Sequence, residues 1–546
     1  MTGITIELDV PVPMRDGVVL RADVYRPAGA GPFPVIVART PYDKSEAAEL
    51  LYLEPVRAAR RGLIAVVQDV RGRFASEGDF QALVNEAEDG ADTIAWAASL
   101  PGSTGVVGMW GLSYLGNVQW QAAGQQPPAL KAIAPSFTFR EGTNGLAQRG
   151  GARELGLVRS WAVGMGFDLL SRRHADDEVE HMKQLELLID AADGTPGPTY
   201  LELPTAVDPV ITRQDLPDLA APVTSGASDV RQHQTRVSVP SLHVAGWYDV
   251  FLQPTLDNYA AAAEQSPAQL VVGPWNHVSQ VAMQGDVNFG VLGNAVDGAT
   301  PLLEHTFDWL HSQLADDATP AGDDLPVKLF VMGENQWRSE PAWPLARAVP
   351  TAYHLGNDAV LTTEPGAAGT RSFTYDPADP VPTMGGPIML PHTAAGAFEQ
   401  SRVEAREDVL LFTGSELTED LEVTGRVTAS LTAETDGPTT DWVVRLCDVH
   451  PDGRSYVVVD GISRVEGTPG EASVVEVDLW STSMVFKKGH RLRVQVTSSC
   501  FPRWDRNLNT VDGARTGEMR SARQTVRVGT GGSTVTLPVV PRAVAE

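Results

Sequence analysis

Cysteine is nearly absent from this chain of 546 residues, which has only Cys447 and Cys500. Two cysteines cannot form a disulfide framework or a cysteine-rich metal site. They are typical of a reducing compartment, so we expect two lone buried thiols. A single bridge between them is the alternative that the sequence leaves open.

The sequence also has no uninterrupted apolar run of about 18 residues, the length that a transmembrane helix needs. Residues 1–7 contain neither the basic region nor the apolar region of a secretory signal. We therefore expect no membrane partner and a cytoplasmic protein, although a processed secreted protein would begin in the same way.

Positive charge is scarce, since 42 Lys and Arg face 69 Asp and Glu, for a net charge of −27. That balance excludes nucleic acid as a partner, because polyanions repel such a chain. The hydrophobic share of 42% and charged share of 20% indicate a globular protein with sizeable cores. Its length predicts two or three domains.

Strand-like and helix-like segments alternate in two parts of the chain, residues 1–135 and 236–320, which predicts one α/β domain. Continuous apolar runs are typical of strands buried on both faces of a mostly parallel sheet. Such runs occupy 35–38, 63–67, 130–135, 241–246 and 269–273, and helices are expected at 46–61 and 86–99.

The intervening residues, 136–235, are richer in glycine and charge and predict a mainly helical insertion, with a helix at 177–192. An insertion at this point lies over the C-terminal edge of the sheet, where ligands bind, so we expect a cap. A polar linker follows near 316–325, and period-2 alternation in 321–546 predicts a jelly-roll β-sandwich.

Ser113 is the candidate nucleophile, because Gly111-Leu112-Ser113-Tyr114-Leu115-Gly116 stands between an apolar run at 106–110 and a helix-like stretch at 119–123. This context suits a nucleophile elbow, the sharp strand-to-helix turn of α/β-hydrolases. The segment departs from G-x-S-x-G, since Leu115 holds the fifth position. The alternative is a small residue in a tight turn.

Asp249 and His277 follow in the order that α/β-hydrolases use, each just after a predicted strand. His277 is the candidate base and Asp249 the carboxylate that orients it. The alternatives are a surface or core histidine and a helix-capping aspartate. His243 lies inside a predicted strand and is expected to be a core residue.

The oxyanion hole is expected to use the backbone N–H of Tyr114, which follows the nucleophile, and a donor from the loop at 39–44. That loop has no glycine run but offers the phenol of Tyr42, which is a competent donor. From spacing alone, Tyr42 as a packing residue is equally acceptable.

Several segments together resemble the cocaine esterase/NonD family of serine hydrolases, which is related to X-prolyl dipeptidyl peptidases and α-amino-acid ester hydrolases. They are RTPYDK at 39–44, QDVRGRFASEG at 68–78, GLSYLG at 111–116, AGWYD at 245–249, GPWNH at 273–277, STSMVF at 481–486 and SSCFPR at 498–503.

The resemblance implies an α/β-hydrolase domain with an inserted helical cap and a C-terminal jelly roll. It places the family's triad on Ser113, Asp249 and His277 and its tyrosine donor on Tyr42. It also implies a structural role for the segment at 69–72, with an Arg71 ion pair near the rim of the site.

The acyl pocket is expected to be uncharged. The α-amino-acid ester hydrolases carry acidic residues just after the catalytic aspartate, whereas here Val250, Phe251 and Leu252 follow Asp249. A buried ammonium without a partner would cost several kcal/mol. Phe251 resembles the aromatic residue of the cocaine esterase acyl site. The other candidate pocket residues are Trp161, Ile388 and Met389, each with an ordinary packing role as the alternative.

The sequence therefore predicts a serine carboxylesterase that hydrolyses small-molecule esters with an apolar or aromatic acyl group through an acyl-enzyme. That chemistry requires no metal or organic cofactor. An amidase, acylase or X-prolyl-type peptidase with the same triad is the first alternative. An inert carbohydrate-binding protein is the second. The sequence does not determine the natural ester substrate or whether the protein forms a homo-oligomer.

Overall fold

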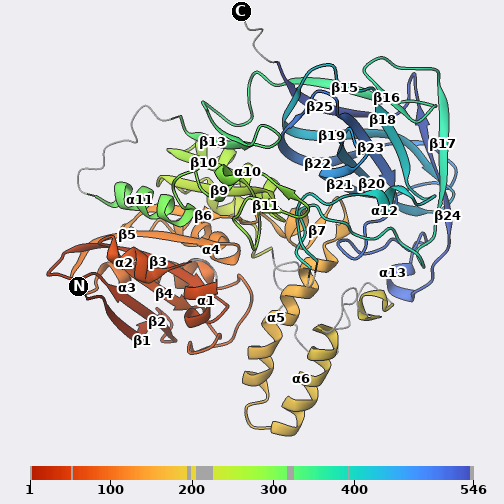
Figure 1. Cartoon of the computed structure of the whole chain (residues 1–546). Coiled ribbons are helices and arrows are strands. Elements are labelled where there is room, and N and C mark those ends of the chain that lie inside the picture. The colour runs from red at the N-terminus through yellow and green to blue at the C-terminus, as the bar shows by residue number, and fades with distance from the viewer. Residues whose placement is uncertain are drawn as a thin grey trace, which may run out of the picture.

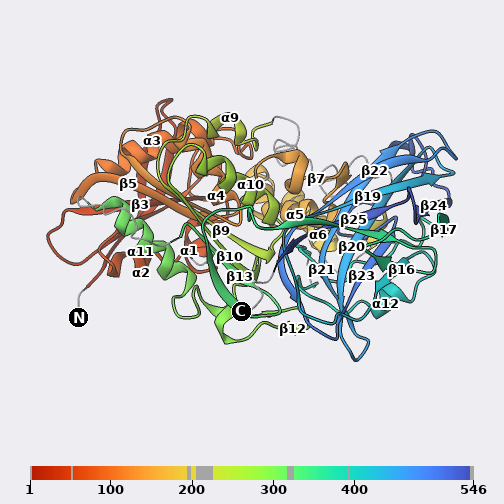
Figure 2. The same ribbon diagram turned by 90° about the horizontal axis from the view of Figure 1, so that it is seen from above.

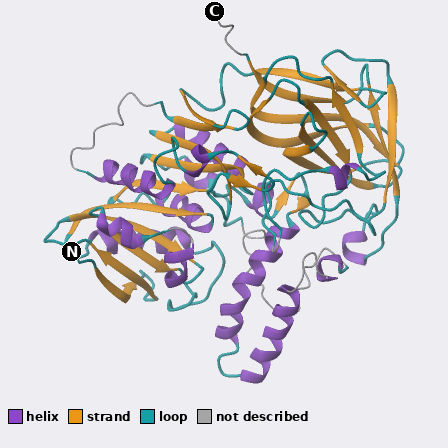
Figure 3. Cartoon of the chain, viewed as in Figure 1, coloured by secondary structure: helices purple, strands orange, loops and turns teal. Residues whose placement is uncertain are grey.

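The computed structural model describes residues 3–50, 53–192, 198–203, 226–315, 325–390 and 393–541. Two β-sheets organise these residues, and Figures 1 and 2 show them side by side, the first built mainly from the N-terminal half and the second from the C-terminal third. A pair of helices, α5 and α6, extends away from both (Figure 3).

The first sheet has the strand order β1-β2-β4-β3-β5-β6-β9-β10-β13-β14. Its central strands are parallel, while β1, β2 and β14 are antiparallel to their neighbours. The strands are β1 (Thr5–Pro13), β2 (Val19–Arg26), β3 (Phe33–Thr40), β4 (Ile64–Asp69), β5 (Ser103–Leu112), β6 (Leu130–Ser136), β9 (Ser241–Tyr248), β10 (Ala268–Asn276), β13 (Val327–Val331) and β14 (Gln336–Glu340).

Helices cover both faces of this sheet. The apolar residues of β3 alternate, so that Val35 and Val37 pack with α3 and α4 while Ile36 and Ala38 pack with α2 and α11. Burial on both faces explains the continuous apolar runs of the strands. The helices are α1 (Lys44–Leu50), α2 (Pro55–Arg60), α3 (Glu86–Ala98), α4 (Tyr114–Ala123), α10 (Leu252–Ala263) and α11 (Leu302–Leu314).

One expected helix is divided. The predicted helix at 46–61 is α1 and α2, with Glu54 between them in the left-handed region at φ 38°. Pro55 disfavours the helical conformation in the residue before it and is well suited to open a new helix. The expected helices at 86–99 and 177–192 correspond to α3 and α6.

The insertion between β6 and β9 is mainly helical in its described part. Its elements are η1 (Gly142–Leu146), β7 (Gln148–Arg149), β8 (Ala152–Arg153), α5 (Leu155–Arg173), α6 (Glu178–Ala192), η2 (Pro198–Leu201) and α9 (Arg231–Gln234). Residues 193–197 and 204–225 of the predicted cap lie outside the described residues. After β10 follow β11 (Met283–Gln284), β12 (Val287–Asn288) and η4 (Val291–Asn294).

The second sheet folds on itself into a β-rich C-terminal domain around one apolar core. Its strands are β15 (Val349–Leu355), β16 (Val360–Thr362), β17 (Gly369–Tyr375), β18 (Leu410–Gly414), β19 (Leu421–Thr435), β20 (Thr439–Val449), β21 (Ser455–Glu466), β22 (Ser473–Phe486), β23 (Arg491–Thr497), β24 (Ala522–Val528) and β25 (Thr534–Val540). The short helices α12 (Ser401–Glu404) and α13 (Gly513–Thr516) lie in its loops.

The first sheet continues for two strands beyond residue 321, the predicted boundary between the two domains. β13 pairs in parallel with β10, and β14 returns antiparallel to β13, so both belong to the first sheet. The second sheet begins at Val349. Val327 and Leu329 occupy alternate positions, as apolar residues do in a strand of either sheet. The sequence pattern therefore could not assign this strand to one of the two sheets. Most of the predicted linker, residues 316–324, lies outside the described residues.

The two domains share a core behind β9. Trp247 of β9 packs in one cluster with Trp480 of β22 and Val540 of β25. Trp247 Nε1 also donates to the carbonyl of Phe330 in β13 at 2.7 Å, and Met332 forms a bridge with Met484 of β22. The strand that precedes Asp249 is therefore supported from both domains.

Both thiols are free and buried, as expected, and burial raises the pKa of Cys447. Among the helices that the structure describes, none has the length and apolar character to cross a membrane.

Candidate active site

Ser113 lies at the sharp turn between β5 and α4, with φ 61° and ψ −124°. This conformation is rare for residues other than glycine and is held by its surroundings. The Ser113 N–H donates to the carbonyl of Ser136 at 3.0 Å, and the Thr138 hydroxyl donates to the Ser113 carbonyl at 2.7 Å. The strained turn has the form of a nucleophile elbow.

The two glycines of the elbow are required by close packing. Gly111 has φ +136°, and a Cβ there would lie 2.6 Å from the Leu115 Cβ. A Cβ on Gly116 would lie 2.7 Å from the Thr138 Cβ. Leu115 itself is fully buried in the core. Position 115 therefore accepts a large apolar side chain, and the close approach that demands glycine falls at 116.

Asp249 and His277 form a hydrogen-bonded pair at the ends of β9 and β10. His277 Nδ1 lies 2.7 Å from Asp249 Oδ2, and the second carboxylate oxygen accepts from the Phe251 N–H at 2.7 Å. Asp249 is fully buried. The carboxylate holds the proton on Nδ1, which leaves Nε2 free to accept one.

Ser113 and His277 line one cavity of about 360 Å³. Tyr42 lines the same cavity. Contacts between nucleophile and base commonly tighten only when substrate is bound. The three predicted triad residues are thus brought to one edge of the sheet.

Tyr42 follows β3 and lines two cavities beside the nucleophile. Its hydroxyl accepts from Trp161 Nε1 at 3.2 Å. Burial raises the pKa of Tyr42, and its hydrogen bonds to Trp161 and Ser113 offset part of that rise. The phenol therefore stays protonated and keeps a proton to donate to an oxyanion.

Tyr114 presents its main chain and its side chain to different parts of the molecule. As the first residue of α4, its N–H has no acceptor within the helix. Its phenol donates to Glu86 at 2.7 Å and accepts from the Leu83 N–H at 2.9 Å. Burial raises the pKa of Tyr114. Only the main chain of Tyr114 is free to act in the site.

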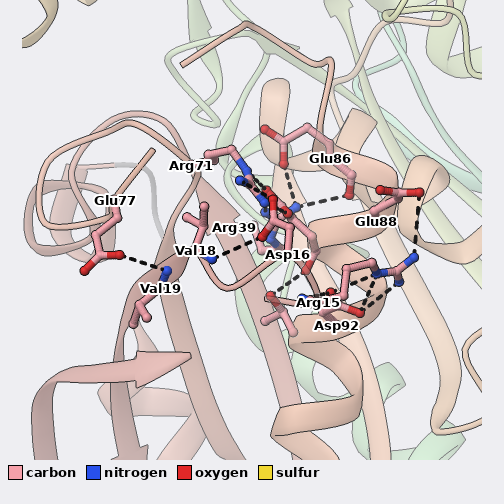
Figure 4. A network of polar contacts seen from close by, with 12 residues as sticks. Arg15, Asp16, Val18, Val19, Arg39, Arg71, Glu77, Glu86, Glu88 and Asp92 are labelled. Carbon is pink, nitrogen blue, oxygen red and sulfur yellow. Dashed lines mark hydrogen bonds and ion pairs between the residues drawn. The ribbon is translucent and has the colours of Figure 1, made fainter. Parts of the chain in front are cut away.

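Glu86 connects the Tyr114 phenol to a network of charged side chains. Arg39 donates to the second oxygen of Glu86 at 2.5 Å, with both side chains buried. Figure 4 shows Arg71 beside Arg39, paired with Asp16 at 2.8 Å. Arg71 also binds Asp89. The expected Arg71 ion pair is present, but Arg71 pairs with Asp16 and with Asp89 of α3 and lines neither cavity beside Ser113.

Arg73, two residues further along, lines the 360 Å³ cavity. Its guanidinium is buried, donates to the carbonyls of Pro41 and Met165 at 2.9 and 3.1 Å, and lies 3.4 Å from Asp168. It joins the Tyr42 loop to helix α5. Sequence reasoning missed this residue, although it stands inside the segment at 68–78.

A second, apolar cavity opens beside Ser113. No charged side chain lines it among the described residues. Its lining residues are Tyr42, Leu83, Ser113, Tyr114, Phe139, Leu146, Ala147, Leu157, Val158, Trp161, Phe251 and Met389. Phe251 stands edge-on to the His277 ring, with centroids 5.1 Å apart, and 5.2 Å from Phe139.

Three of the four predicted pocket residues line this cavity and one does not. Phe251, Trp161 and Met389 line this cavity, and the last two also line the larger one. The prediction for Ile388 is wrong, since its side chain packs in a separate cluster that includes Leu155 and Phe501. Phe139 and Leu157 were missed. Leu157 could have been found, because it precedes Trp161 by four residues on α5 and so shares its face.

Comparisons with known proteins cover nearly the whole chain. Residues 16–279 match the family described as X-Pro dipeptidyl-peptidase (S15 family), and residues 321–534 match the X-Pro dipeptidyl-peptidase C-terminal non-catalytic domain. The chain is 34% identical to the cocaine esterase of Rhodococcus sp. (strain MB1 Bresler), over 93% of each protein. It is 25% identical to a putative serine esterase of Mycobacterium bovis, over 89% of each.

Comparison with solved structures also matches nearly the whole chain to hydrolases. An α-amino acid ester hydrolase matches with a TM-score of 0.78 at 27% identity, covering 98% of this chain and 97% of that one. A CocE/NonD family hydrolase of Staphylococcus aureus shares the fold with a TM-score of 0.70 at 18% identity, covering 99% and 97%.

Proposed function

The chain belongs to the CocE/NonD family and is a serine carboxylic ester hydrolase, and within that activity we propose that its substrates are esters with an uncharged, apolar or aromatic acyl group. The observation that carries this preference is the apolar cavity beside Ser113. An acyl chain that enters it meets aromatic and aliphatic side chains and loses contact with water, which stabilises the complex.

A free ammonium in the acyl group would be poorly accommodated. The residues that follow Asp249 are apolar, and no carboxylate lines the cavity among the described residues. The charged side chain that lines the larger cavity, Arg73, is itself a cation. An unpaired ammonium would therefore meet repulsion rather than a partner.

The proposed reaction proceeds in two halves. His277 Nε2 takes the Ser113 proton as the oxygen attacks the ester carbonyl, and Asp249 stabilises the imidazolium. Tyr42 and the Tyr114 N–H donate to the tetrahedral oxyanion. His277 returns the proton to the leaving alcohol, which leaves an acyl-enzyme on Ser113. Water, deprotonated by His277, then releases the acid.

One matched pair of esters tests the acyl preference. Methyl phenylacetate and phenylglycine methyl ester differ only by an α-amino group. We expect kcat/KM for the first to be higher by roughly 100-fold, the equivalent of about 3 kcal/mol of unpaired charge. Equal values, or faster turnover of the amino ester, would overturn the proposal. A fluorophosphonate probe should label the protein and fail to label Ser113→Ala.

A second candidate is a peptidase or acylase, which the match to the X-Pro dipeptidyl-peptidase family supports. Amide cleavage uses the same triad but requires protonation of an amine leaving group. A p-nitrophenyl ester assayed beside the p-nitroanilide of the same acyl group separates the two activities. Faster release of p-nitroaniline, or turnover of glycyl-prolyl-p-nitroanilide, would favour this second candidate.

A further inference from the structure

Three side chains of the C-terminal domain gather at one end of its sheet, away from the triad. They are Asp448, the penultimate residue of β20, His450 just beyond that strand, and His490 just before β23. The ladder between β20 and β23 pairs Val449 with Arg491. Because side chains alternate along strands, Asp448, His450 and His490 therefore project to one face.

The ligand-type atoms of these residues are close together. His490 Nδ1 lies 2.9 Å and 3.0 Å from the two oxygens of Asp448, and His450 Nε2 lies 3.3 Å from Oδ2. All three ligand atoms fall within 4.8 Å of one another. Around a tetrahedral zinc ion with bonds of about 2.0–2.1 Å, ligand atoms are roughly 3.3 Å apart.

The surroundings hold the rings in place. The imidazoles of His450 and His490 are in contact, with centroids 4.4 Å apart and their planes tilted by 41°, and Tyr456 packs against His450 at 4.8 Å. Asp448 is 2% exposed, and its side-chain partners among the described residues are the two imidazoles. Arg454, on the same hairpin, is already paired with Asp452. The carboxylate is therefore held between two imidazole rings and shielded from water.

From this geometry we propose that Asp448, His450 and His490 bind a divalent transition-metal ion of the zinc type. Two imidazole nitrogens and one carboxylate oxygen are the donors that zinc accepts, whereas calcium and magnesium prefer oxygen alone. The ion replaces the proton between His490 and Asp448, and water takes the fourth position. It joins the β20–β21 hairpin to β23 and stabilises that end of the sheet. This site is independent of the ester-hydrolysing residues.

Metal binding by the full-length protein tests the proposal. After treatment with EDTA, the protein is dialysed against zinc, calcium or magnesium and its metal content is measured. We expect one zinc per chain, a higher Tm with zinc, and no stoichiometric calcium or magnesium. The variants His450→Ala and His490→Ala should each weaken zinc binding by about tenfold or more, while the exposed His311→Ala should bind as the native protein does.

Cobalt provides a second readout that does not depend on stability. Co²⁺ in place of zinc should give visible absorption bands of a four- or five-coordinate ion, and the isosteric Asp448→Asn should lose them while staying folded by circular dichroism. Ester hydrolysis should be unchanged in all these variants. Zinc uptake that is absent, or that persists undiminished in His450→Ala and His490→Ala, would overturn the site, as would equal uptake of calcium.

Discussion

The Trp161 indole of the cap donates a hydrogen bond to the Tyr42 phenol across 3.2 Å, so the cap contacts the residue that we assign to the oxyanion. Trp161→Phe removes this donor and keeps an aromatic ring. A neutral hydrogen bond contributes about 1 kcal/mol, so kcat should fall about fivefold. Steady-state kinetics with a p-nitrophenyl ester measure this decrease in kcat. Trp96→Phe on α3 is the control, and an equal loss there would remove Trp161 from the mechanism.

Tyr42→Phe should have a larger effect, because the donor to the oxyanion itself is lost. We expect kcat to fall roughly 100-fold with little change in KM. Tyr353→Phe, in the C-terminal domain, should keep full activity. In the double variant with Trp161→Phe, the second substitution should add almost nothing, since both act through one phenol. An unchanged rate in Tyr42→Phe would mean that the Tyr42 phenol does not donate to the oxyanion.

Leu157 is expected to limit the length of the acyl chain, because it lines the apolar cavity. Leu157→Ala should raise kcat/KM for p-nitrophenyl hexanoate relative to the acetate. Leu169→Ala is the matched control, since Leu169 is a similarly buried leucine of the same helix that lines neither cavity beside Ser113. If both variants changed the hexanoate-to-acetate ratio alike, the cavity would not be the acyl pocket.

Gly111 and Gly164 should respond oppositely to alanine. Gly111→Ala forces a Cβ to 2.6 Å from Leu115 at φ +136°, so the elbow must distort and activity should be lost. Gly164, within α5, has no atom within 4 Å of a built Cβ. Gly164→Ala should raise the free energy of unfolding by about 0.5–1 kcal/mol, although its new methyl group enters the 360 Å³ cavity that Gly164 lines. Urea denaturation and ester turnover test both, and an active Gly111→Ala would contradict the packing argument.

His243 makes the stability of the fold sensitive to acid. It is fully buried between Trp120 and Tyr259, and burial lowers its pKa from 6.5 to about 3. Between these values the unfolded chain binds a proton that the folded chain does not. The free energy of unfolding therefore decreases as the pH falls below 6.5, by up to about 1.4 kcal/mol per pH unit from this group.

His243→Phe should remove this contribution. Urea denaturation at pH 7.5 and pH 5 should show a smaller loss for the variant than for the native protein. His311→Gln, on the exposed end of α11, should behave as the native protein does. An identical loss in His243→Phe would mean that other groups cause the acid sensitivity.

The sequence was sufficient to bring the candidate triad together, because Ser113, Asp249 and His277 each follow a buried parallel strand and such strand ends meet at one edge. It could not separate Ile388 from Met389. These neighbours lie in a loop without periodicity, and their side chains enter different clusters. It also gave no sign of the Asp448 cluster, since only the register of β20 and β23 places His490 beside His450.

The core shared by Trp247, Trp480 and Val540 has a consequence for biosynthesis. A ribosome releases the N-terminal strands long before β22 and β25. The apolar side chains of β9 that pack against these two strands therefore stay exposed until β25 emerges. Exposed apolar surface of this kind makes partly synthesised chains prone to aggregation. The order of the chain therefore delays a fully packed catalytic strand until β25 has been synthesised.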